Sequence, residues 1–83
     1  MKIKDQILKI FSEHSGLAQD QIEPDFDLEK DLNLGQMERT DLFLKLEDVF
    51  KIKFEKKFLQ RNPPVEEIVS YIIEATGEFE KET

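Results

Sequence analysis

Oxygen-bearing side chains recur at alternate positions in one short segment, a spacing that could chelate a divalent cation. They are Asp25, Asp27, Glu29, Asp31 and Asn33. Two positions argue against a calcium loop, because Lys30 occupies the sixth place, where a glycine is needed, and Gln36 cannot supply the bidentate carboxylate of the twelfth. We therefore expect Leu28 and Leu32 to face inward, the acids to face water, and no metal site. An acidic, divalent-ion-binding helical protein remains an alternative.

Groups for nucleophilic or acid–base catalysis are scarce. The chain has no cysteine, which excludes a thiol nucleophile, a disulfide and a cysteine-based zinc site. Its single histidine, His14, lies two residues before Gly16 at the end of a predicted helix, where an imidazole can cap carbonyl groups. The three glycines are isolated and form no phosphate-binding loop. We predict that the protein is not an enzyme.

A basic segment, residues 51–61, contains five basic residues and one acidic residue. Three apolar residues interleave with the charges, as in segments that contact membranes or anionic partners. They are Phe54, Phe58 and Leu59. The simpler interpretation is that these three side chains pack inward while the basic residues balance the acidic loop.

Apolar residues at helical spacing predict three helices, over residues 3–14, 36–50 and 64–76, with a short helical segment at 55–61. The second stripe contains Leu42, Leu46, Val49 and Phe50. Each helix offers one apolar face, so the expected fold is all-α, a small four-helix bundle. A long loop, residues 16–35, precedes the second helix, and we expect its apolar residues to pin it to the core. Residues 1–77 would form the domain and residues 78–83 a charged tail.

Composition excludes further classes of protein. The chain has 83 residues and a net charge of −7. Such acidity disfavours nucleic acid as a partner, and no apolar run is long enough to span a membrane. We expect a cytoplasmic protein and a monomer.

The segments Asp25–Met37 and Asp41–Ile52 resemble an acyl carrier protein. That family has a long first loop ending in Asp-Leu-Gly-x-Asp-Ser-Leu, then a helix reading Glu-Leu-x-x-x-Leu-Glu-x-x-Phe-x-Ile. Without a gap, Asp31-Leu32 fits the loop and Asp41-Leu42, Leu46-Glu47, Phe50 and Ile52 fit the helix. Val65 and Tyr71-Ile72 fit the last helix. The resemblance covers residues 3–75 and implies the carrier-protein type of four-helix bundle, with a short third helix.

The chain departs from the family where the serine should stand, because it reads Gly35-Gln36-Met37. In carriers, that serine hydroxyl becomes a phosphodiester to phosphopantetheine, whose thiol holds the acyl group. The carboxamide of Gln36 has no hydroxyl, so we expect no phosphopantetheine and no other cofactor. The ungapped match favours a natural carrier-like protein that has lost the arm over an engineered variant or a shifted alignment.

The resemblance also implies a docking face on the second helix, which partner enzymes read through acidic and apolar residues. The matching positions are Met37, Glu38, Asp41, Leu44, Glu47 and Asp48. A plain solvated helix face is the alternative interpretation. The leading hypothesis is a docking or regulatory module in fatty-acid, polyketide or related acyl biosynthesis, whose partners are acyl-processing enzymes with basic docking surfaces. The runner-up is a working carrier whose arm attaches in an unrecognised way.

Overall fold

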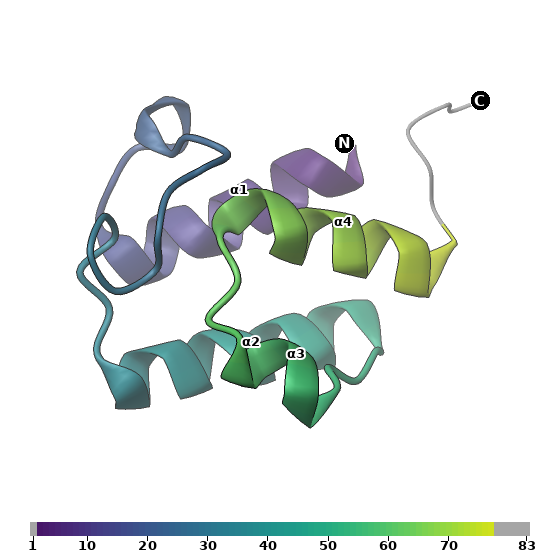
Figure 1. Ribbon diagram of the computed structural model, residues 1–83. Helices are drawn as coiled ribbons and strands as arrows, with labels where there is room; N and C mark the ends of the chain where they lie inside the picture. The colour runs from purple at the N-terminus through teal and green to yellow at the C-terminus, as the bar shows by residue number, and fades with distance from the viewer. Residues whose placement is uncertain (1, 78–83) are drawn as a thin grey trace.

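The computed structural model describes residues 2–77; the predicted charged tail, residues 78–83, lies outside the described residues. Residues 2–77 form four α-helices and one 3-10 turn, and Figure 1 shows how the helices are arranged. They are α1 (Ile3–Ser15), η1 (Gln19–Gln21), α2 (Gln36–Phe50), α3 (Lys56–Gln60) and α4 (Val65–Thr76). Residues 2–77 contain no strand, so the predicted all-α bundle with a short third helix is confirmed. Within the same residues, no helix has the length and apolar composition to cross a membrane.

A residue in the left-handed backbone conformation ends each of α1, α2 and α4. Gly16 has φ of 82° and its N–H donates to the Ser12 carbonyl, which confirms it as the predicted stop of α1. Gly77 ends α4 in the same way, with φ of 74°. Lys51 ends α2 with φ of 58°, a conformation that costs a residue with a Cβ roughly 1–2 kcal/mol.

The core lies where α1, α2 and α4 meet. Six side chains from these helices have no exposed surface: Ile7, Phe11, Leu42, Leu46, Ile68 and Ile72. Burying each contributes about 1.5–3 kcal/mol. Val49 was predicted to face inward, and this is wrong, because it is 41% exposed. It lies in the last turn of α2, at the end of the bundle, and lines an open groove there with Ile3 and Ala75.

The long loop is pinned to the core as predicted, by Ile22, Leu28, Leu32 and Leu34, all buried. It also caps α4, because the N–H groups of Val65 and Glu66 donate to the carbonyls of Phe26 (3.1 Å) and Pro24 (2.8 Å). The loop thereby satisfies two donors that a helix leaves free at its start. The sequence carried no clear signal for η1, the short turn near the beginning of this loop.

The basic segment, residues 51–61, packs its aromatic residues inward, as expected. Phe54 is 7% exposed, and its ring centroid lies 5.2 Å from Phe43 and 5.0 Å from Tyr71. The ring centroid of Phe58 lies 4.5 Å from that of Tyr71, with the two rings tilted by 35°. Tyr71 also accepts a hydrogen bond from the Glu55 N–H (3.0 Å) and donates one to the Lys53 carbonyl (3.1 Å). These contacts fasten the segment to α4.

The balance of charge between the basic residues and the acidic loop stays a prediction, since neither ion pair of residues 2–77 joins the segment to the loop. Within residues 2–77, Arg61 is the one cation of the segment in an ion pair, and its partner is Glu67 of α4, at 3.0 Å.

Candidate functional site

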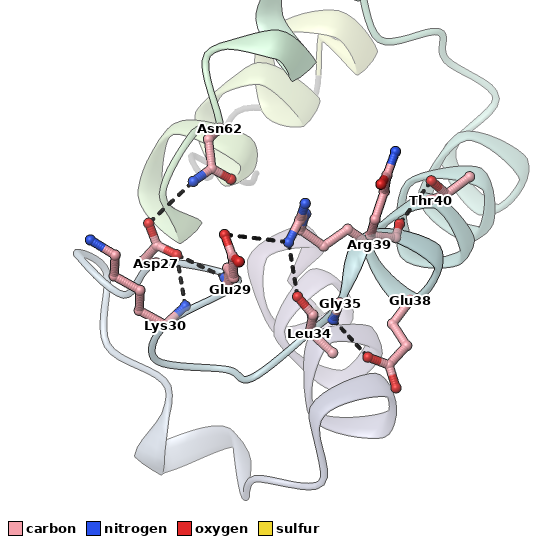
Figure 2. Close-up of polar contacts among 10 residues, drawn as sticks. Asp27, Glu29, Lys30, Leu34, Gly35, Glu38, Arg39, Thr40 and Asn62 are labelled. Atoms are coloured by element: carbon pink, nitrogen blue, oxygen red, sulfur yellow. Dashed lines mark hydrogen bonds and ion pairs between the residues drawn. The ribbon is translucent and has the colours of Figure 1, made fainter.

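The start of α2, which the resemblance matches to the serine of carrier proteins, is an exposed helix end held by its own first turn. Gln36 is the first residue of α2 and is exposed. The N–H of Gly35 donates to Oε1 of Glu38 at 2.7 Å (Figure 2), which is one half of a capping box. Glu38 therefore turns its carboxylate back to the helix end, where negative charge is favourable.

Arg39 ties this helix end to the long loop. Its Nη1 donates to the Leu34 carbonyl at 2.9 Å and lies 3.8 Å from Oε1 of Glu29 (Figure 2). The Glu29 side chain is 64% exposed, so the ion pair contributes little and the carbonyl contact matters more. Sequence reasoning missed this role, and no spacing rule would have signalled it.

Asp27 holds together a turn of the long loop through hydrogen bonds of its carboxylate. Its Oδ1 accepts the N–H groups of Glu29 (2.8 Å) and Lys30 (2.9 Å), and its Oδ2 accepts the Asn62 amide at 3.3 Å (Figure 2). The hydrogen bond from the Lys30 N–H is the main reason that the pKa of Asp27 lies below its ordinary value of 3.8. The contact with Asn62 joins the loop to the linker between α3 and α4.

Two of the alternating acids of the loop, Asp27 and Asp31, accept hydrogen bonds from its backbone. Besides Asp27, Asp31 accepts the Asp27 N–H at 2.7 Å through Oδ2. Leu28 and Leu32 are buried, as predicted. Within residues 2–77, no three His, Cys, Asp or Glu side chains gather closely enough to hold a metal ion. Asp27 and Asp31 thus have a role in forming the turn.

Hydroxyl groups elsewhere do not occupy the start of α2. Thr40 is exposed one turn further along, and its Oγ1 donates to the Gln36 carbonyl at 3.0 Å. Ser12 donates to the Leu17 carbonyl and Ser15 accepts the Leu17 N–H, so both close the end of α1. Ser70 is exposed in the middle of α4.

The predicted docking face forms a continuous exposed stripe along α2. We call Met37, Asp41, Leu44 and Asp48 the α2 stripe; they follow one another at spacings of three and four residues. All four are exposed, with exposed fractions of 81% for Met37 and 57% for Leu44. Glu38 is exposed beside them. Glu47 differs, because it is half-buried and its Oε2 accepts the Phe54 N–H at 2.9 Å.

A groove separates α2 from α3. It has a volume of about 410 Å³, and its lining includes Gln36, Thr40, Phe43, Leu44, Lys56 and Leu59. Leu44 belongs to both the α2 stripe and the groove, so the two form one surface. This α2–α3 groove begins beside Gln36.

Comparison with known proteins supports the carrier resemblance. The chain is similar to an acyl carrier protein of Nitratidesulfovibrio vulgaris strain Miyazaki F, at 24% identity over 72 residues, which cover 87% of this chain and 95% of that protein. No protein-family model matches the chain. The similarity spans nearly all of both proteins, and it supports an acyl-carrier-like domain.

Proposed function

We propose that the protein is an acyl-carrier-like docking module that binds acyl-processing enzymes without carrying an acyl group itself. The observation that carries this proposal is the α2 stripe, which presents two carboxylates and two large apolar side chains to solvent. Exposed apolar residues as large as Met37 and Leu44, set between charges on one helix face, are typical of a binding surface. The pathway would be fatty-acid, polyketide or related acyl biosynthesis.

The start of α2 does not fit a phosphopantetheine group. Attachment needs a hydroxyl oxygen at the exposed helix end, and Gln36 offers a carboxamide, whose nitrogen is not nucleophilic. The serines at the end of α1 already hydrogen bond to the backbone there. On this reasoning the protein would occupy a carrier's place on an enzyme and regulate the complex or complete its structure, with no chemistry of its own.

The negative charge of the α2 stripe favours partners with basic docking surfaces. Asp41 and Asp48 have no ion-pair partner within residues 2–77, so their full charge faces the solvent. Surface carboxylates of this kind raise the association rate and select partners, more than they add affinity. The apolar Leu44 and Met37 would supply the contact area once the partner has arrived.

Competition with an ordinary carrier tests the proposal. A purified acyl-processing enzyme is assayed with a loaded acyl carrier protein, and the present protein is added as a competitor. We expect it to raise the KM for the carrier while kcat stays constant. Reversing the stripe charges, Asp41→Lys with Asp48→Lys, should weaken this inhibition at least about tenfold, because two attractive charges become repulsive.

The matched control makes the same charge change elsewhere. Asp20→Lys with Glu23→Lys alters exposed residues of the long loop and should leave inhibition within about twofold, since exposed charges beyond a Debye length of about 10 Å are screened. Equal inhibition by the stripe variant and the native protein would contradict the docking face.

A further inference from the structure

The basic segment carries positive charge that forms no ion pair within residues 2–77. Lys53, Lys56 and Lys57 are exposed and take part in neither ion pair of the described structure. Glu55, the one acid of the segment, pairs with none of them, and Arg61 alone is paired. A local positive surface thus stands on a chain of net charge −7, where it is open to an anionic group of a partner.

The lysines are held on a fixed support. Phe54 is buried and Phe58 is half-buried against the core, and the hydroxyl of Tyr71 bonds to the backbone on either side of Phe54. These contacts order the segment before any partner arrives, so binding there need not pay for ordering it. Lys56 is therefore presented in a defined place beside the α2–α3 groove.

The charged residues that line the α2–α3 groove are Arg39, Glu47 and Lys56. Arg39 is held by the long loop through a carbonyl and an ion pair, and the carboxylate of Glu47 already accepts a backbone N–H. Lys56 is the one of the three without a polar partner within residues 2–77. Asp41 and Asp48 do not line the groove, so the charge that it offers to an occupant is positive.

The rest of the groove offers apolar walls and free hydrogen-bond donors. Phe43 and Leu44 line it on the α2 side and Leu59 on the α3 side, around a volume of about 410 Å³, which falls in the range of about 300–1,000 Å³ for ligand clefts. The side-chain amides of Gln36 and Gln60 also line it and make no hydrogen bond within the described residues. The groove can therefore take an apolar side chain and donate hydrogen bonds to acceptors beside it.

We propose that the α2–α3 groove binds a short acidic segment of a partner protein that carries one large apolar residue next to a carboxylate. The apolar side chain enters between Leu44 and Leu59, and the carboxylate faces Lys56. The amides of Gln36 and Gln60 donate to carbonyl groups of the bound segment. This goes beyond the proposed function, which assigns the basic surfaces of partners to the α2 stripe and leaves the groove without an occupant.

Other anionic occupants fit these observations less well. The apolar lining is recessed between two helices, where a protruding side chain can reach it and a flat bilayer cannot. The net charge of −7 disfavours nucleic acid, which brings many phosphates near the whole molecule. A second copy has acidic segments of its own, but two molecules of this charge repel each other.

Three short peptides provide the test. The acidic peptide has a central leucine flanked by glutamates; the neutral peptide has glutamines in place of the glutamates, and the third peptide has alanine in place of the leucine. Each is titrated into the ¹⁵N-labelled protein. We expect the acidic peptide to bind about threefold to tenfold more tightly than the neutral one, with amide shifts confined to α2 and α3. Loss of the leucine should weaken binding at least about threefold.

A pair of matched variants locates the charge. Lys56→Gln with Lys57→Gln should abolish the preference for the acidic peptide. Lys4→Gln with Lys9→Gln makes the same change of net charge at exposed positions of α1 and should keep the preference. Equal binding of the acidic and neutral peptides, a preference that survives the Lys56 and Lys57 changes, or one that the α1 changes also abolish, overturns the inference.

Two further results would assign the lysines to another occupant and also overturn the inference. They are a dimer in sedimentation velocity, or sedimentation with phosphatidylglycerol vesicles, that the Lys56 and Lys57 changes abolish. If the peptides discriminate as expected but enzyme competition fails, the proposed function falls and the acidic-segment site stands. The converse result removes the acidic-segment site alone.

Discussion

Replacing Asp27 by alanine should destabilise the protein, because this carboxylate holds the turn of the long loop. It accepts backbone N–H groups from Glu29 and Lys30 and the side-chain amide of Asn62. Losing the two backbone contacts resembles the loss of a helix N-cap, which costs about 0.5–2 kcal/mol. The contact with Asn62 is longer and exposed, so we expect a total near 1.5 kcal/mol.

Urea unfolding at neutral pH, followed by circular dichroism, measures this change. The midpoint should fall while the slope stays constant, and the melting temperature should fall by about 4–8 °C for each kcal/mol. Asp25→Ala is the matched control, since Asp25 is an exposed acid two residues away that makes no hydrogen bond or ion pair within residues 2–77. It should change the free energy of unfolding by less than about 0.5 kcal/mol.

The effect of Asp27 should also depend on pH. Its pKa is lower in the folded protein than its ordinary value of 3.8, chiefly because of the Lys30 N–H. Its stabilising contribution is therefore complete above the unfolded pKa and is lost as the pH falls through the folded pKa. The difference between the native protein and Asp27→Ala should be constant from about pH 5 to 8 and shrink below about pH 4. A cost equal to that of Asp25→Ala, or a difference that grows in acid, would refute the assigned role.

The remaining predictions concern packing. Tyr71→Phe should lower the free energy of unfolding, measured in urea, by about 1 kcal/mol, because it removes two hydrogen bonds to the basic segment. An unchanged urea midpoint would show that these hydrogen bonds do not stabilise the protein. Leu42→Ala should lower the free energy of unfolding by about 2–5 kcal/mol, since the Leu42 side chain is fully buried. Val49→Ala should lower the free energy of unfolding by less than about 1 kcal/mol, because Val49 is 41% exposed. Similar losses of stability for Leu42→Ala and Val49→Ala would contradict the described core.

The helices could be predicted because each depends on local signals. Apolar residues at a period of 3.6 and a glycine stop identified α1, and Gly16 does end it in the left-handed conformation. Val49 fits the same periodicity, yet it is exposed because the bundle ends beside it. Periodicity describes one helix and carries no information about where its neighbours stop.

The polar contacts of the site could not be predicted in the same way. The resemblance to carrier proteins placed Glu47 on the docking face, but its carboxylate accepts the N–H of Phe54, seven residues away. Arg39 reaches back to the Leu34 carbonyl, and Asp27 meets Asn62 across 35 residues of sequence. Such contacts depend on how the loop folds over the helices. The exposed residues of the α2 stripe, in contrast, could be predicted from the helix and its register alone.

Intact mass spectrometry tests most directly our proposal that this protein bears no phosphopantetheine arm. The protein is incubated with coenzyme A, magnesium and a phosphopantetheinyl transferase of broad specificity, beside a Gln36→Ser variant. We predict an unchanged mass for the native chain and the gain of one phosphopantetheine group by the variant, whose new hydroxyl stands at the exposed start of α2. A stoichiometric gain by the native chain would contradict the claim, and peptide mapping would then identify the hydroxyl that accepted the group.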